Sequence, residues 1–259
     1  MPDIAVNGLS FRVKIEGSAN APTIMLSNSL GASLEMWDPQ VAALMPNYRI
    51  VRYDGRGHGK SSVSAGPYSI EQLGKDALGI LDSLQIKRVH WCGLSMGGMI
   101  GQWVGAHAPE RLDKIVLANT TCYYPNPSFW VERIEAVRQG GIAAIADRVI
   151  AGWLTADYRD REPSVAAHMK AMLLGTPQAG YIASCEALSK LDQRDLLPMV
   201  KSRTLVIAGR HDASTPVKDA EFIRSKIPDA GLKILEAAHI SNVEQSQAFS
   251  SALLEFLSR

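Results

Sequence analysis

Cysteine is scarce in this chain of 259 residues, and the three present, Cys92, Cys122 and Cys185, lie far apart. The absence of a C-x-x-C pair argues against a zinc knuckle or a dithiol redox site. An odd number of scattered cysteines is typical of reduced thiols, so we expect a cytoplasmic protein. The first residues, MPDIAVNG, also lack the basic and apolar segments of a signal peptide.

An excess of one charge is also missing, because 27 Lys and Arg residues face 26 Asp and Glu residues. Nucleic-acid-binding proteins usually carry a basic excess, and anionic membranes attract polybasic runs. We therefore expect neither a nucleic acid nor a membrane as a partner. No window approaches the roughly 18 uninterrupted apolar residues of a transmembrane helix. The sequence carries no signal for an oligomeric state.

Cofactor motifs are absent as well. Neither H-E-x-x-H nor G-x-G-x-x-G occurs, so we expect no metal and no nicotinamide cofactor. The segment DGRGHGKS, residues 54–61, resembles a phosphate-binding loop, but only three residues separate Gly55 from Gly59 where that motif needs four. No helical pattern follows it directly. We therefore expect no nucleotide and no other cofactor.

What is present favours a globular α/β chain, with 46% hydrophobic and 20% charged residues. Short runs of Val, Ile and Leu alternate with helical patterns, which predicts a doubly wound, mostly parallel sheet covered on both faces. Residues 4–17 are predicted to form a hairpin that turns at Asn7-Gly8. We expect strands at 23–28, 49–54, 89–93, 114–120, 204–209 and 232–237, and helices at 36–45, 70–84, 96–107, 217–227 and 243–257.

One long interval breaks this alternation. About 80 residues separate the strand that ends near Thr120 from the strand that starts near Thr204, far more than one crossover needs. Helical periodicity fills the interval, with breaks at 140–141, 155–163 and 175–177. We predict a helical cap inserted into the sheet domain. The resulting division is a first core segment at 1–121, the cap at 122–186 and a second core segment at 187–259.

The segment Gly93-Leu94-Ser95-Met96-Gly97-Gly98 follows a predicted strand and begins a predicted helix. A G-x-S-x-G sequence in this strand–turn–helix context is typical of a nucleophile elbow. Its glycines let strand and helix approach closely, and the helix N-terminus faces the place where negative charge develops. We expect Ser95 to be the catalytic nucleophile. The alternative is a glycine-rich turn that holds a serine without a catalytic role.

A serine nucleophile requires a base, and the base requires an orienting acid. Asp212 and His239 each follow a predicted strand, where functional groups gather in doubly wound sheets. The chain order Ser95, Asp212, His239 is that of α/β-hydrolases. His211 adjoins Asp212, and adjacent loop side chains usually diverge, so we expect Asp212 to orient His239. The alternative for Asp212 is a turn or helix-capping aspartate.

Acyl transfer also needs amides that bind the oxyanion. The N–H of Met96 directly follows the nucleophile, and the loop at residues 27–33 follows an early strand. We predict that the amides of Leu30 and Met96 form the oxyanion hole. The alternative for Leu30 is an ordinary strand–helix turn.

Four segments, GLSMGG, DGRGHGKS, GRHDASTP and AAHISNVEQ, together resemble an α/β-hydrolase with a helical cap over essentially the whole chain. SNSLGASLEMWDPQ, with YRIVRYDGRGHGKS after it, closely resembles the bacterial 3-oxoadipate enol-lactonases of the β-ketoadipate pathway. Many α/β-hydrolases have His-Gly where this chain has Asn28-Ser29, but the enol-lactonases share this departure. The resemblance implies hydrolysis of the ring ester of a small anionic enol-lactone.

Other activities share the same Ser–Asp–His layout. Serine carboxylesterases, carbon–carbon bond hydrolases and cofactor-free perhydrolases remain alternatives, as does a non-catalytic receptor for a small ligand. Relatives with aspartate or cysteine at the elbow are disfavoured, because the elbow residue here is Ser95 and Cys92 lies upstream in the strand.

An anionic lactone would need a cation in its pocket. In the first cap helix, Trp130, Ile134 and Val137 form one apolar stripe that Arg133 borders. We predict that Arg133 binds the substrate carboxylate and that Trp130 and Trp153 form apolar walls beside it. The alternative for Arg133 is an ion pair with a surface carboxylate.

Overall fold

The short Val, Ile and Leu runs form one eight-stranded sheet in a computed structural model that describes residues 3–259. Its order is β1-β2-β4-β3-β5-β6-β7-β8; β2 runs antiparallel to β1 and β4, and the neighbours from β4 to β8 are parallel. The predicted fold class is therefore confirmed. The strands are β1 (Asp3–Val6), β2 (Leu9–Glu16), β3 (Thr23–Ser27), β4 (Arg49–Tyr53), β5 (Val89–Leu94), β6 (Leu112–Ala118), β7 (Arg203–Gly209) and β8 (Gly231–Leu235).

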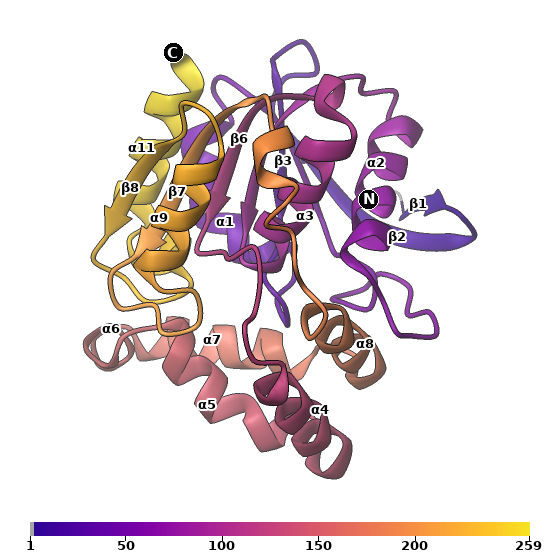
Figure 1. The fold of residues 1–259 in the computed structure, drawn as a ribbon, viewed down its shortest axis with the longest axis vertical. Helices are drawn as coiled ribbons and strands as arrows, with labels where there is room; N and C mark the ends of the chain where they lie inside the picture. The colour runs from indigo at the N-terminus through magenta and orange to yellow at the C-terminus, as the bar shows by residue number, and fades with distance from the viewer. Residues whose placement is uncertain (1–2) are drawn as a thin grey trace.

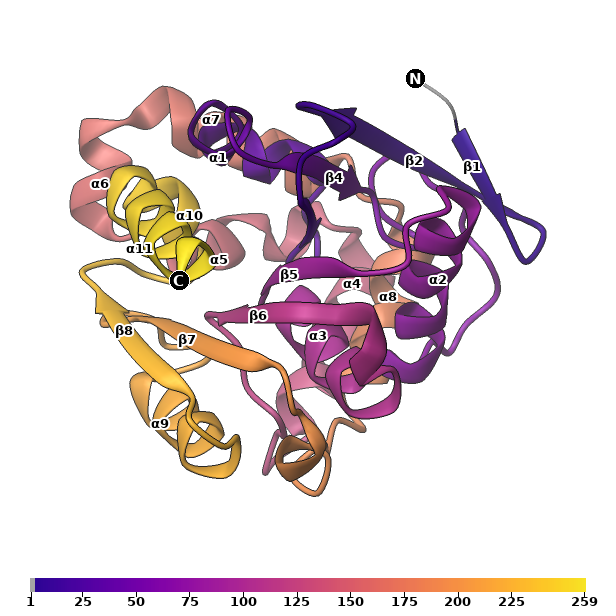
Figure 2. The ribbon, with the colours of Figure 1, turned by 90° about the horizontal axis from the view of Figure 1, so that it is seen from above.

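Helices cover both faces of the sheet, so all six residues of β5 are buried. Figure 2 shows α2, α3 and α9 on one face and α1 and α11 on the other. The helices outside the long interval are α1 (Asp38–Leu44), α2 (Ile70–Ser83), α3 (Met96–His107), α9 (Val217–Lys226), α10 (Ser241–Glu244) and α11 (Ser246–Ser258), with short 3-10 turns at Leu34–Trp37, Pro109–Arg111 and Leu197–Met199.

Five helices lie between β6 and β7 and form a layer beside the sheet (Figure 1). The segment 155–163, expected as a break, contains a short helix, because the Thr155 side chain accepts the N–H of Tyr158 and caps it. The last of the five continues past residue 186 to Leu188. They are α4 (Ser128–Gly140), α5 (Ala143–Trp153), α6 (Ala156–Arg161), α7 (Pro163–Leu174) and α8 (Gln178–Leu188).

The two ends of this cap segment lie side by side. Tyr123 and Asp192 form an isolated antiparallel bridge. Beside it, the N–H of Gln193 donates to the carbonyl of Cys122 at 2.7 Å, and the N–H of Tyr124 donates to that of Leu191 at 3.3 Å. The chain therefore leaves the sheet and returns to it through one narrow neck.

Two local predictions have different outcomes. The hairpin at 4–17 is confirmed, because Asn7 and Gly8 have φ angles of 50° and 79°, as a tight turn requires. The single helix predicted at 243–257 is wrong. Gln245 takes φ −123° and ψ 50°, which separates α10 from α11, and Glu244 at the end of α10 is buried. No helix within residues 3–259 is long and apolar enough to span a membrane.

Candidate active site

Ser95 lies at the sharp turn between β5 and α3. Its φ of 57° is a left-handed conformation that side chains other than glycine rarely adopt. A Cβ on Gly93 would overlap the backbone of Gly97, and a Cβ on Gly97 would overlap the carbonyl of Ser27. Glycine at both positions therefore allows the tight turn that presents Ser95 at the carboxyl end of the sheet.

Asp212 and His239, from the loops after β7 and β8, are in direct contact. The distance from His239 Nδ1 to Asp212 Oδ2 is 2.8 Å, and both side chains are buried. Burial alone would raise the pKa of Asp212, but the charge and hydrogen bond of His239 and the bonds from Asn119 and Thr215 hold it below its usual value. Asp212 is thus a carboxylate suited to orient His239 and to stabilise its imidazolium form.

Asn119 is a partner of this pair that the sequence analysis missed. Its Nδ2 donates to Asp212 Oδ2 at 3.0 Å and to the carbonyl of Ala238, while Ser241 donates to its Oδ1. Its φ is 42°. A signal existed, because Asn119 directly follows the apolar run of β6, just as Ser95 follows that of β5.

His211 points away from the pair. Its side chain is 53% exposed and lies 3.4 Å from Glu236. Asp212 instead directs its carboxylate inward, where Ser214 and Thr215 amides donate to Oδ1. The geometry therefore favours His239 over His211 as the partner of Asp212.

Ser95 and His239 line one cavity of about 340 Å³ between the sheet and the cap. The structure places Leu30, Trp130, Arg133 and Trp153 in the wall of this cavity. Met96 is buried and does not line it.

Within residues 3–259, no hydrogen bond joins the Ser95 hydroxyl to His239, and such bonds often tighten only when substrate is present. The wall also includes Tyr124, Arg148 and Tyr181, which the sequence analysis missed.

Arg133 has no carboxylate partner among the described residues. Its guanidinium lies 4.5 Å from the ring centroid of Phe129 and 5.4 Å from that of Trp130, and Nη1 donates to the Tyr181 hydroxyl at 3.4 Å. No Asp or Glu of residues 3–259 lines the cavity, whereas Arg148 adds a second cation to it. The wall is therefore apolar and positively charged, which suits a small organic anion.

The amides of Leu30 and Met96 have no hydrogen-bond acceptor within residues 3–259. Their two segments are joined, because the N–H of Gly97 donates to the carbonyl of Asn28 at 2.9 Å. Asn28 is itself held, since Nδ2 donates to the carbonyl of Tyr53 and Oδ1 accepts the indole N–H of Trp37. The two amides are thus unoccupied donors on a fixed backbone.

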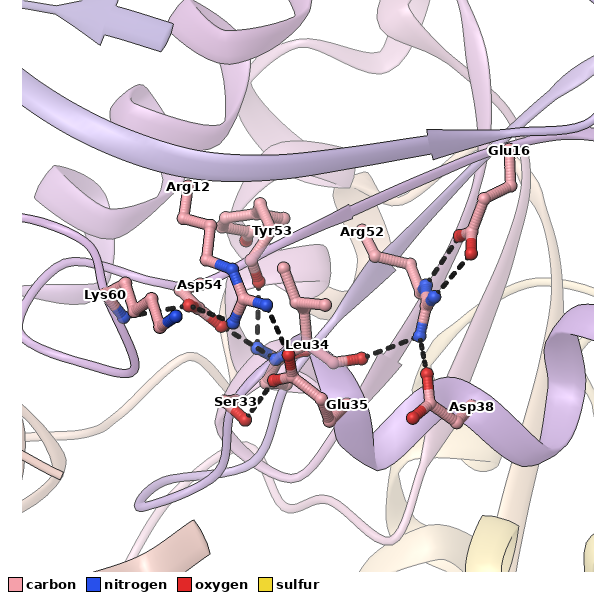
Figure 3. Close-up of polar contacts among 11 residues, drawn as sticks. Arg12, Glu16, Ser33, Leu34, Glu35, Asp38, Arg52, Tyr53, Asp54 and Lys60 are labelled. Atoms are coloured by element: carbon pink, nitrogen blue, oxygen red, sulfur yellow. Dashed lines mark hydrogen bonds and ion pairs between the residues drawn. The ribbon is translucent and has the colours of Figure 1, made fainter. Parts of the chain in front are cut away.

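A charged network holds the end of the loop that contains Leu30 (Figure 3). Asp54, at the end of β4, accepts the N–H of Leu34 at 2.7 Å and that of Lys60 at 2.9 Å and pairs with Arg12. The buried guanidinium of Arg52 donates to the carbonyl of Leu34. The segment DGRGHGKS thus anchors this loop, since Lys60 closes its turn onto Asp54.

We expect Asp54→Asn to lower the free energy of unfolding by about 1–3 kcal/mol. The single amide oxygen of Asn cannot replace both carboxylate oxygens, so the N–H of Leu34 or Lys60 loses its acceptor in a buried site. Urea denaturation measures the loss. Asp38→Asn is the matched control, because Asp38 pairs with Arg52 in the same region but is 55% exposed. Equal losses in the two variants would contradict the anchoring role of Asp54.

Comparisons with known proteins agree with this fold. A profile of the alpha/beta hydrolase fold family matches residues 22–141. The chain is 40% identical over 257 residues to 3-oxoadipate enol-lactonase 2 of Acinetobacter baylyi, which covers 99% of this chain and 94% of that protein. The crystal structure of the enol-lactonase from Burkholderia xenovorans LB400 matches with a TM-score of 0.98, 43% identity and full coverage of both chains.

A further relative carries a different name. The putative carbamate hydrolase RutD of Stutzerimonas stutzeri is 32% identical over 249 residues, which is 92% of each chain. The resemblance to the enol-lactonases is confirmed, and so is membership of the wider family. By sequence and by structure, this chain is a hydrolase that belongs to the alpha/beta hydrolase family.

Proposed function

We propose that the protein hydrolyses a small anionic enol-lactone, 3-oxoadipate enol-lactone, to 3-oxoadipate in aromatic-compound catabolism. The observation that carries this proposal is the cavity that contains Ser95, His239 and the unpaired Arg133 but no carboxylate among the described residues. An arginine without a counter-ion in an apolar wall favours a ligand that brings its own negative charge. Relatives named as enol-lactonases at 38–40% identity support the same substrate.

In the proposed mechanism, Ser95 Oγ attacks the lactone carbonyl while His239 takes its proton. Asp212 holds His239 in the tautomer that accepts the proton at Nε2, because Nδ1 faces the carboxylate. The amides of Leu30 and Met96 bind the oxyanion of the tetrahedral intermediate. The ring C–O bond then breaks, and the proton on His239 passes to the leaving enol oxygen. The enol tautomerises to a ketone, and this favours ring opening.

The second half of the reaction releases the acyl enzyme. His239 takes a proton from a water molecule, whose oxygen attacks the ester carbon on Ser95. The proton returns to Ser95 Oγ as the acyl–oxygen bond breaks, which regenerates the enzyme and leaves a carboxylic acid that loses its proton to solvent. Throughout both steps, Arg133 holds the other carboxylate, with Trp130 and Trp153 beside the carbon chain.

Hydrolysis of a carbamate is a second candidate, favoured by the relative named as a putative carbamate hydrolase at 32% identity. The same nucleophile, base and oxyanion donors would serve both reactions. Rates on the lactone and on a carbamate of similar size, measured with one enzyme preparation, distinguish them. A higher kcat/KM for the carbamate would overturn the lactone proposal.

Arg133→Leu tests the anionic substrate. We expect kcat/KM for the lactone to fall by about 30- to several thousand-fold, because a buried charged contact contributes about 2–5 kcal/mol. The methyl ester of the same lactone lacks the free carboxylate and should lose little. Steady-state kinetics on both compounds measure this difference.

Arg138→Leu is the matched control for Arg133→Leu. Arg138 lies on the same helix, is 55% exposed, pairs with Glu186 and does not line the cavity. It should leave both rates near wild type. Equal losses on acid and methyl ester in Arg133→Leu would mean that Arg133 supports the fold and does not read the substrate charge.

A further inference from the structure

Both backbone neighbours of His239 are linked to the cap, Ile240 directly and Ala238 through Glu244. The N–H of Ile240 donates to the carbonyl of Trp153 at 2.9 Å. On the other side, the N–H of Ala238 donates to Glu244 Oε2 at 2.9 Å, and the same carboxylate accepts the N–H and the hydroxyl of Thr155. Trp153 ends α5, and Thr155 caps the start of α6. The junction of these two cap helices therefore contacts the loop after β8, which contains His239.

Glu244 is an unusual residue for a buried site. It is 7% exposed, and no Lys, Arg or His within residues 3–259 forms an ion pair with it. Its charge is compensated by three donors, namely two backbone N–H groups and one hydroxyl. Buried carboxylates are costly unless hydrogen-bonded, and a neutral side chain would fill the space without that cost. Glu244 is the last residue of α10 and lies directly before the break at Gln245.

We propose that Glu244 is a positioning residue for His239. Its carboxylate clamps Ala238, the residue before His239, to Thr155 of the cap. This inference rests on the proposed role of His239 as the base. Trp153 lines the cavity, and its carbonyl accepts the N–H of Ile240 on the other side of His239. The clamp and this bond together fix the position of His239 relative to the cap wall of the cavity. A displacement of about 1 Å at a catalytic group can cost about 100-fold in rate, so a carboxylate that never touches substrate can control turnover.

The test compares Glu244→Leu with Glu244→Gln on p-nitrophenyl acetate, a neutral ester that needs no arginine contact. The glutamine oxygen can accept the two N–H groups while the Thr155 hydroxyl reverses to accept from its amide, so Gln should stay within about threefold of wild type. Leu removes every acceptor and should lower kcat by about 10- to 100-fold with little change in KM. Glu236→Leu is the control, because Glu236 is an exposed carboxylate near the same loop and should leave kcat unchanged.

A spectroscopic readout separates positioning from general destabilisation. The His239 Nδ1–H resonance, followed in protein labelled with ¹⁵N-histidine, should shift or exchange faster in Glu244→Leu and stay unchanged in Glu244→Gln. If Glu244→Leu does not fold, Thr155→Val removes one donor from the clamp and should lower kcat several-fold with the same change in this resonance. A folded Leu variant with wild-type kcat, a Gln variant as slow as Leu, or a loss of kcat without any change in the resonance would each overturn the proposal. Failure of the triad itself appears separately, as p-nitrophenyl acetate hydrolysis that survives Ser95→Ala.

Discussion

Replacing Ser95 by alanine is expected to lower kcat for the lactone by about 10⁴- to 10⁶-fold. The elbow gives this hydroxyl its position at the strand end, where it lines the cavity together with His239. Alanine fits the same turn, so the variant should fold with a nearly unchanged melting temperature. Stopped assays at high enzyme concentration measure the residual rate.

Two controls make the Ser95→Ala result specific. Ser214→Ala removes a hydroxyl that also lines the cavity but leaves the backbone N–H that donates to Asp212, so its kcat should stay near wild type. Binding of the product acid by Ser95→Ala, measured by calorimetry, should persist, because Arg133 and the cap wall remain. Near-native turnover by Ser95→Ala would exclude the serine mechanism.

His239→Ala is expected to reduce kcat by a similar factor of about 10⁴ or more, whereas His211→Ala should change it less than about threefold. His239 is buried against Asp212, while His211 is half exposed beside Glu236. The two substitutions are chemically identical, so their comparison isolates position. Steady-state kinetics on the lactone and on a neutral ester provide the ranking, and the opposite ranking would remove His239 from the proposed triad.

The residues at strand ends were the most accessible to sequence analysis. Ser95, Asp212 and His239 each follow an apolar strand run, and the carboxyl ends of parallel strands meet at one edge of a sheet. The fold class and the apolar strand runs are therefore enough to predict that these three side chains lie at the same edge of the sheet. Asn119 has the same position after β6, but an asparagine has no chemistry of its own that marks it as a functional residue.

The cap residues were predicted less completely, because their positions depend on packing over long distances in the sequence. The apolar stripe of α4 singled out Trp130 and Arg133, and both line the cavity in the structure. Arg148 and Tyr181 reach the same wall from α5 and α8. Their orientation depends on the angles at which these helices pack, and no local period encodes those angles. The inward turn of Glu244 was missed for the same reason, since the pattern of 243–257 suits one continuous helix.

The narrow neck at Tyr123 and Asp192 has a consequence for how new specificities arise. Because β6 and β7 pair directly, everything between the two neck residues can be exchanged as a single cassette without breaking the sheet. Recombination at these two points would transfer the cap's share of the substrate wall from one hydrolase to another, while the core's share stays in place. A transplanted cassette must still present an acceptor to the N–H of Ile240 and donors to Glu244, so these bonds are among those that limit which caps are compatible with this core.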